Sequence, residues 1–145
     1  MNTSSLVFKR KFNLPKRQLF EAWSNPQIMQ RWFFGGPLRE NCCTVENQFV
    51  TNGEYKITMH FENTGDSELY GKYLEINRYN KIVFTWSNSL VTDTVVKLSF
   101  KELSPNTSEL TLEHSLFPDE TTRSLHNQGW EQCLENLAIA MEEAA

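Results

Sequence analysis

The chain has few cysteines, no long apolar run and no basic cluster, and each absence excludes a class of protein. Its 145 residues include three cysteines, Cys42, Cys43 and Cys133. Adjacent cysteines do not readily bridge each other and the number is odd, so no disulfide framework is indicated. No stretch approaches the roughly 20 apolar residues of a membrane span, and the N-terminal MNTSSLVFKRKFNL lacks a signal-peptide core. We therefore expect a reduced, cytoplasmic protein without a membrane span.

Positive charge and sequence repeats are also scarce. The net charge is −4, and the basic run FKRKF at residues 8–12 fits one exposed face of a strand. This balance argues against nucleic acid as a partner. The sequence has no internal repeat, linker or low-complexity tract, and a length of 145 residues favours a single domain over residues 1–145.

What the chain does have is aromatic side chains, which make up 12% of it and include ten phenylalanines. That content suits a sizeable core and leaves room for a cavity walled by rings.

The N-terminal part of the sequence predicts a strand followed by two short helices. Apolar residues alternate with polar ones over residues 6–12, as in a strand. In the next segment Asn13 is a candidate helix cap, and Pro15 suits a first helical turn. Pro26 ends this helix, because it biases the preceding residue away from helical geometry. QIMQRWF, at residues 27–33, predicts a second short helix that a Gly-Gly pair terminates.

From about residue 40 the apolar period changes to two, which predicts consecutive antiparallel strands. The clearest segments are GEYKITMHFE, KIVFTW, TVVKLSF and LTLEHSL, separated by turn-like sequences. The inner face of another segment, LYGKYLEI, stays open because both of its phases contain apolar residues.

The C-terminal segment predicts one long amphipathic helix. Asp119, Thr121 or Thr122 can cap its start. His126 precedes Trp130 by one turn on the same face, and the apolar stripe continues through Cys133, Leu134, Leu137 and Met141.

The order is therefore β-α-α-β-β-β-β-β-β-α, an α+β fold. An antiparallel sheet of about seven strands cannot bury its inner face alone, and the long C-terminal helix is its natural cover. A curved sheet wrapped around one helix leaves a wedge between them, which we predict to be a ligand pocket.

This order and four sequence stretches resemble the family of activator of heat-shock protein 90 ATPase homologues, a START/SRPBCC branch with the helix-grip fold. The stretches, FNLPKRQLFEAWSNPQIMQRWF, NGEYKITM, GKYLEINRYNKIVFTW, and LTLEHSLF with HNQGWEQCLENL, span about residues 5 to 142. The family often has an acidic-x-Arg-x-Gly-Gly segment before the third strand, where this chain reads QFVTNGEY. The resemblance implies the helix-grip fold, but most of this branch consists of binding or stress-linked proteins of unassigned role.

The side chains expected to line the pocket come from the inner faces of the strands and the long helix, and from the three-ring run before Gly35-Gly36. That run forms either a gate over the pocket or a satellite core under a loop, and the second is favoured. The predicted cavity residues are Trp32, Phe34, Tyr55, Ile57, Met59, Phe84, Trp86, Val96, Leu98, Leu112, His114, His126, Trp130 and Leu134.

The two histidines in this set each have a structural and a functional interpretation. His114 is in phase with inward-facing leucines, so it is either a neutral core histidine or a pocket-lining donor or acceptor. His126 either seals the end of the sheet, half exposed, or faces His114 across the mouth of the cavity. No carboxylate or second base stands where it would orient either imidazole for catalysis. Two histidines without a third ligand also fall short of a metal site.

Three functions are therefore open. The leading prediction is a protein of unassigned physiological role that binds a hydrophobic or aromatic small molecule, with no cofactor and no metal. The resemblance implies an alternative, a co-chaperone-like protein that interacts with heat-shock protein 90. A further alternative is a polyketide cyclase- or hydrolase-like enzyme, which the lack of an acid/base pair disfavours. Both a monomer and a homodimer are open.

Overall fold

The chain folds into one antiparallel sheet, two short helices and one long helix. The computed structural model describes residues 5–33, 43–61 and 65–143. Within these residues the elements are β1 (Leu6–Phe12), α1 (Lys16–Glu21), α2 (Pro26–Met29), β2 (Cys43–Asn47), β3 (Glu54–Phe61), β4 (Gly65–Asn77), β5 (Lys81–Trp86), β6 (Thr94–Ser104), β7 (Thr107–Ser115) and α3 (Glu120–Glu143). The seven described strands form one sheet in the order β1-β7-β6-β5-β4-β3-β2.

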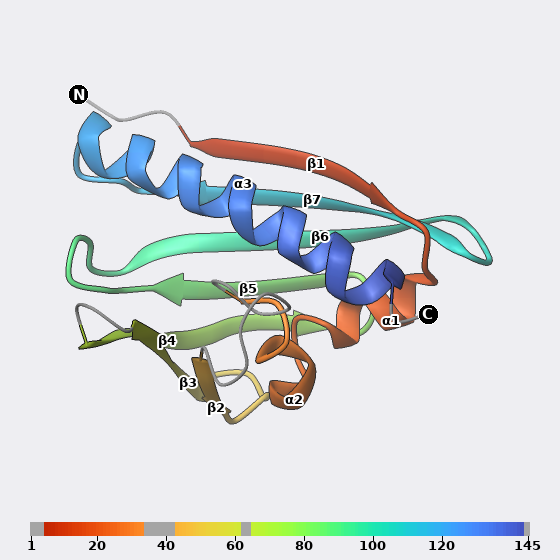
Figure 1. Cartoon of the computed structure of the whole chain (residues 1–145), viewed down its shortest axis with the longest axis horizontal. Helices are drawn as coiled ribbons and strands as arrows, with labels where there is room; N and C mark the ends of the chain where they lie inside the picture. The colour runs from red at the N-terminus through yellow and green to blue at the C-terminus, as the bar shows by residue number, and fades with distance from the viewer. Residues whose placement is uncertain (1–4, 34–42, 62–64, 144–145) are drawn as a thin grey trace.

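The long helix covers one face of this sheet. Figure 1 shows α3 lying across the curved sheet, with α1 beside its C-terminal end. This is the helix-grip arrangement, so the predicted α+β fold and element order are confirmed. No described helix has both the length and the apolar character that crossing a membrane requires.

The helix starts follow local chemistry, with one difference from the prediction. Pro15, not Asn13, stands at the N-cap of α1, and no side chain caps that helix. Pro26 begins α2 at its first position, while the Asn25 side chain accepts a hydrogen bond from the Gln27 backbone N–H at 2.9 Å. At the start of α3, Asp119 Oδ1 accepts from the Thr122 backbone N–H at 2.8 Å, as predicted for a cap.

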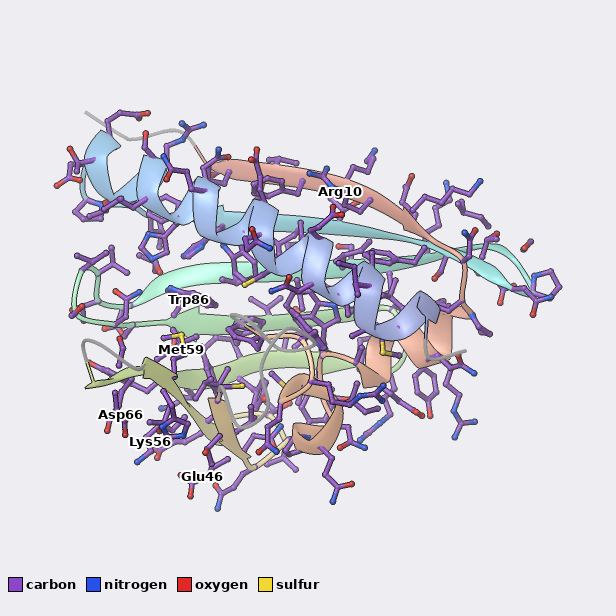
Figure 2. All side chains as sticks on the ribbon, in the orientation of Figure 1. Arg10, Glu46, Lys56, Met59, Asp66 and Trp86 are labelled. Carbon is purple, nitrogen blue, oxygen red and sulfur yellow. The ribbon has the colours of Figure 1, made fainter. Side chains whose placement is uncertain are left out.

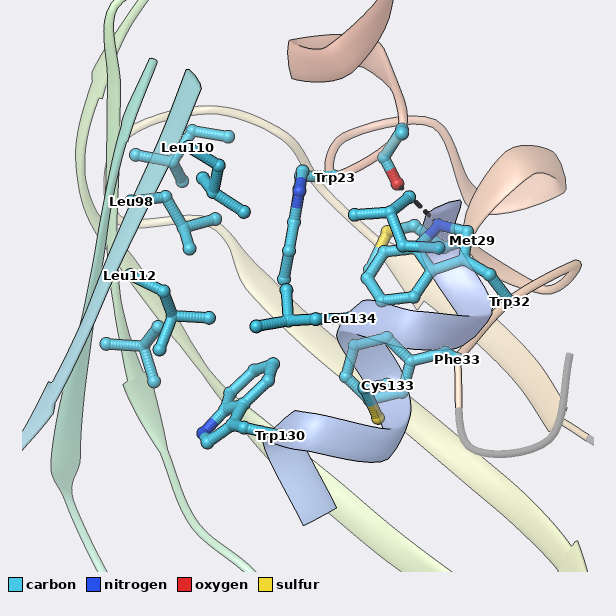
Figure 3. Close-up of a cluster of buried hydrophobic side chains, with 14 of the residues drawn as sticks. Trp23, Met29, Trp32, Phe33, Leu98, Leu110, Leu112, Trp130, Cys133 and Leu134 are labelled. Carbon is cyan, nitrogen blue, oxygen red and sulfur yellow. Dashed lines mark hydrogen bonds between the residues drawn. The ribbon is translucent and has the colours of Figure 1, made fainter. Parts of the chain in front are cut away.

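The core lies between the sheet and α3. Figure 3 shows Leu98, Leu110 and Leu112 of the strands facing Trp130 and Leu134 of α3. Phe20 of α1 and Met29 of α2 also belong to this core, and the Phe20 ring packs against Phe100 of β6 with ring centres 5.2 Å apart.

Two of the three rings predicted as a gate or a satellite core belong to this main core. Trp32 and Phe33 are buried, and Trp32 Nε1 donates to the Ala22 carbonyl oxygen at 3.0 Å (dashed in Figure 3). The Trp23 and Trp32 ring centres are 4.7 Å apart. Phe34 lies outside the described residues.

The inner face of β4, which the sequence left undetermined, is the face that includes Gly71. Leu69 and Tyr73 are buried, so Gly71 shares their inward phase, and the register of β4 with β5 shifts just beyond Tyr73. A Cβ atom on Gly71 would lie 2.1 Å from the Thr85 carbonyl oxygen, so β4 and β5 approach more closely here than any side chain permits.

Replacing Gly71 with alanine should therefore destabilise the protein. Because the obstructing atom is backbone, the strands must move apart, and we expect a loss of about 1–3 kcal/mol or more in urea unfolding. Lys72→Ala, an exposed neighbour on the same strand, is the control and should change the free energy of unfolding by no more than about 0.5 kcal/mol. Equal effects of the two substitutions would contradict the close approach.

Candidate ligand-binding site

A chain of hydrogen bonds through His114 links α3 to the sheet. Trp130 Nε1 donates to His114 Nδ1 at 3.0 Å, and His114 Nε2 lies 2.8 Å from Thr94 Oγ1. The Thr94 hydroxyl in turn donates to the Trp86 carbonyl oxygen at 2.7 Å. Because an indole N–H can only donate, His114 Nδ1 must be the unprotonated nitrogen. His114 is thus a neutral imidazole whose Nε2–H donates to Thr94.

Burial supports this protonation state. His114 is 0% exposed, and burial, followed by the nearby His126, lowers the pKa of His114 from 6.5 to about 3. Both ring nitrogens have partners. Of the two interpretations of His114, the geometry matches the neutral core histidine.

His126 is neutral in the opposite tautomer. Its Nδ1 lies 2.7 Å from the Thr122 carbonyl oxygen, which can only accept, so Nδ1 has the proton. His126 Nε2 then accepts from Asn88 Nδ2 at 3.1 Å. The Asn88 Oδ1 is held by the backbone N–H groups of Leu90 and Val91, at 2.8 and 3.0 Å, which fixes the orientation of the amide. Burial also lowers the pKa of His126.

The sequence expectation of a half-exposed His126 is wrong, because the side chain is only 7% exposed. The His114 and His126 ring centres are 5.3 Å apart, so the two rings do meet. Phe117, which was not among the predicted residues, packs against both, with ring centres 4.3 Å from His114 and 5.2 Å from His126.

A cavity of about 190 Å³ opens where the ends of β3 and β5 meet the first turns of α3. Figure 2 labels Met59 of β3 and Trp86 of β5 at this end of the molecule. The Trp86 and Trp130 ring centres are 4.8 Å apart on its wall. The cavity is lined by Met59, Ser67, Trp86, Asn88, Leu90, Leu125, His126, Gly129 and Trp130.

Away from this cavity, the side chains of the described core residues pack within the predicted wedge. Four of the predicted residues, Met59, Trp86, His126 and Trp130, line the cavity. Tyr55, Ile57 and Phe84 line a void of about 10 Å³ beside it, which has room for no more than a water molecule. The packed core, away from both spaces, holds Trp32, Val96, Leu98, Leu112, His114 and Leu134.

The polar and rim residues of the cavity were not among the predicted residues. Asn88 and Leu90 lie in the connection between β5 and β6, which has no apolar period, and Leu125 lies beside the predicted helical stripe. The SNSL tetrapeptide at residues 87–90 is a turn signal, and it was the only available pointer to Asn88.

A larger hollow of about 580 Å³ lies on the opposite, outward face of β2, β3 and β4. Its exposed charges have both signs, with Glu46, Glu54 and Asp93 beside Lys56 and Lys72. Glu46 and Lys56 approach to 3.9 Å. Such a mixture selects no single ligand chemistry, so we place the candidate site at the smaller cavity.

The neighbours of His114 and His126 show which chemical groups meet at this site. Within residues 5–33, 43–61 and 65–143, no group of three or more His, Cys, Asp or Glu side chains is placed to hold a metal ion. The partners of His114 and His126 are an indole, a hydroxyl, an amide and a backbone carbonyl. A carboxylate, which would orient an imidazole for acid/base work, is not among them.

The fold and this site define a helix-grip protein with a small cavity under the start of its long helix. Residues 13–142 match the family model described as Activator of Hsp90 ATPase homolog 1-like protein, and the chain belongs to this family. No curated protein matches the chain.

Solved structures with the same fold come from several organisms. The AHSA1 protein of Silicibacter pomeroyi is 16% identical, with a TM-score of 0.80 over 98% of this chain and 100% of that chain. PFC0360w, an HSP90 activator from Plasmodium falciparum, is 18% identical, with a TM-score of 0.75 over 97% of both chains. Protein CV1439 of Chromobacterium violaceum is 19% identical, with a TM-score of 0.77 over 94% and 96%. At these identities the similarity shows the fold alone.

The neutral state of His114 predicts a pH dependence of stability. The unfolded chain binds a proton near pH 6.5 that the folded protein takes up only near pH 3. The neutral His114 therefore contributes to the free energy of unfolding. This contribution is complete above pH 6.5 and is lost as the pH falls, by up to about 1.4 kcal/mol per pH unit. His114→Gln removes this group, so its free energy of unfolding should fall less steeply than that of the wild type between about pH 6 and 4.

Urea unfolding at several pH values measures both slopes. Leu112→Ala is the control, because it weakens the same core without removing a titrating group and should keep the wild-type slope. Equal slopes for the wild type and His114→Gln would contradict a neutral buried His114.

Proposed function

We propose that the protein, as one domain over residues 1–145, binds a small, uncharged and largely apolar molecule in the cavity at the start of α3. The observation that carries this proposal is the chemistry of the wall. Two indole rings, Met59, Leu90 and Leu125 line it, and its described lining includes no Asp, Glu, Lys or Arg. Sites that take small apolar ligands have this composition, with a few placed polar groups.

The size of the cavity supports a ligand with about one ring. Its volume is about 190 Å³. An engineered protein cavity of about 150 Å³ with apolar walls accepts benzene, so a substituted single ring fits this space.

The rim offers an apolar entrance. Leu90 and Leu125 both line the cavity and are 51% and 47% exposed. Removing an apolar molecule from water is favourable, and exposed leucines beside a cavity let this gain begin before the ligand is fully buried.

Gly129 gives a direct test, because it lines the cavity from within α3. Gly129→Leu should fill the space and abolish binding. The same change removes a helical glycine, so it should not weaken the helix. In a thermal-shift screen of neutral single-ring compounds, we expect ligands that raise the melting temperature of the wild type but not of Gly129→Leu.

Gly129→Ala is the matched control. It improves the helix in the same way but adds only one methyl group, so it should keep most of the binding. If no neutral apolar compound stabilises the wild type, or if Gly129→Leu responds as the wild type does, the proposed function is wrong.

A second candidate function is an interaction with a heat-shock protein 90 chaperone. Membership of the family and the HSP90 activator among the similar structures favour it. The test is the ATPase rate of the purified chaperone with and without the protein. Stimulation that Gly129→Leu retains would show a role that does not need the cavity, whereas no stimulation and no complex would remove this candidate.

A further inference from the structure

The histidines and Trp130 around the cavity use their hydrogen-bonding groups within the protein. Trp130 Nε1 donates to His114, so Trp130 faces the cavity with carbon atoms and its ring. Both nitrogens of His126 are occupied, one by Thr122 and one by Asn88. These side chains therefore shape the wall without offering a ligand a polar contact.

Asn88 is different, because its amide nitrogen has two hydrogens. One of them points to His126 Nε2. Among the described residues, no group accepts the second. The amide cannot turn over without cost, because its oxygen accepts two backbone N–H groups, those of Leu90 and Val91. Asn88 thus faces the cavity as a donor of fixed orientation.

We infer that the ligand is an uncharged aromatic molecule with a hydrogen-bond acceptor, such as a carbonyl oxygen, and that Asn88 Nδ2 donates to this acceptor. This inference rests on the proposed function and deepens it. We infer an aromatic ligand because the indole rings of Trp86 and Trp130 form the wall, with their centres 4.8 Å apart. The acceptor follows from the fixed Asn88 donor.

The same wall disfavours a carboxylate. A bound carboxylate would lose water without gaining a cation, since His126 is neutral and the described lining residues include neither lysine nor arginine. The Ser67 hydroxyl, on β4, also lines the cavity. It can donate or accept, so by itself it does not select between ligands with and without an acceptor.

Three probes of similar shape test this inference on the intact protein. Acetophenone has a carbonyl acceptor, ethylbenzene has none, and benzoate is charged. We expect acetophenone to bind about 2- to 10-fold more tightly than ethylbenzene, as one hydrogen bond allows, and benzoate to bind more weakly than both. Calorimetry or tryptophan fluorescence gives the affinities, and the Asn88 side-chain NH₂ signal in ¹⁵N NMR should shift with acetophenone but not with ethylbenzene.

Asn88→Asp is the informative variant. It keeps an oxygen for the Leu90 and Val91 N–H groups but replaces the donor with a second oxygen, so the preference for acetophenone should disappear. Ser67→Ala is the matched control and should retain the preference. If Asn88→Asp does not fold, the wild-type affinities and the Asn88 NMR signal still test whether Asn88 donates to the ligand.

The outcomes separate the two proposals. If none of the three probes binds, the proposed function is overturned, and this inference falls with it. If ethylbenzene binds as tightly as acetophenone, or if Asn88→Asp retains the preference, the cavity still binds apolar molecules and only the inference is overturned. Loss of the preference in Ser67→Ala would assign the donor to Ser67 and overturn the role of Asn88.

Discussion

Four groups in one hydrogen-bonded chain, the Trp130 indole, the His114 imidazole, the Thr94 hydroxyl and the Trp86 carbonyl, hold α3 against the sheet. Strand register makes the chain possible, because Thr94 pairs with Trp86 and Val96 pairs with His114. All four groups are deeply buried, and each would cost about 1–3 kcal/mol if left without a partner. The position of Trp130, and with it the first turns of α3, follows from satisfying them.

The cavity is a consequence of this attachment. Trp130 and Trp86 form its wall, and Gly129 leaves space beside them on the same helix. His126 is one turn earlier, where its bonds to Thr122 and Asn88 join α3 to the connection after β5. The site is therefore a largely apolar space in which Trp130 and His126 use their polar groups within the protein, while Asn88 and Ser67 can still offer polar groups to a ligand.

Much of the fold was predictable, because apolar periods of two and of 3.6 residues distinguish the strands from α3. The phase of β4 was not, since both phases of LYGKYLEI contain apolar residues, and a glycine inside a strand suggests a close approach without showing that the Thr85 backbone makes it. For the site, the inward positions of Trp86, His126 and Trp130 were predictable. Periodicity gives direction but not volume, so it could not show that Val96, Leu98 and Leu112 fill the wedge. Asn88 lies in an aperiodic turn, and only its contacts give it a role.

The protonation of the two histidines is the central claim, and long-range ¹H–¹⁵N NMR of the imidazole rings at neutral pH measures it directly. We expect two neutral rings with opposite tautomers, with the proton on Nε2 in His114 and on Nδ1 in His126. An imidazolium at either position, or the same tautomer at both, would contradict the hydrogen-bonded chain and the orientation of Asn88.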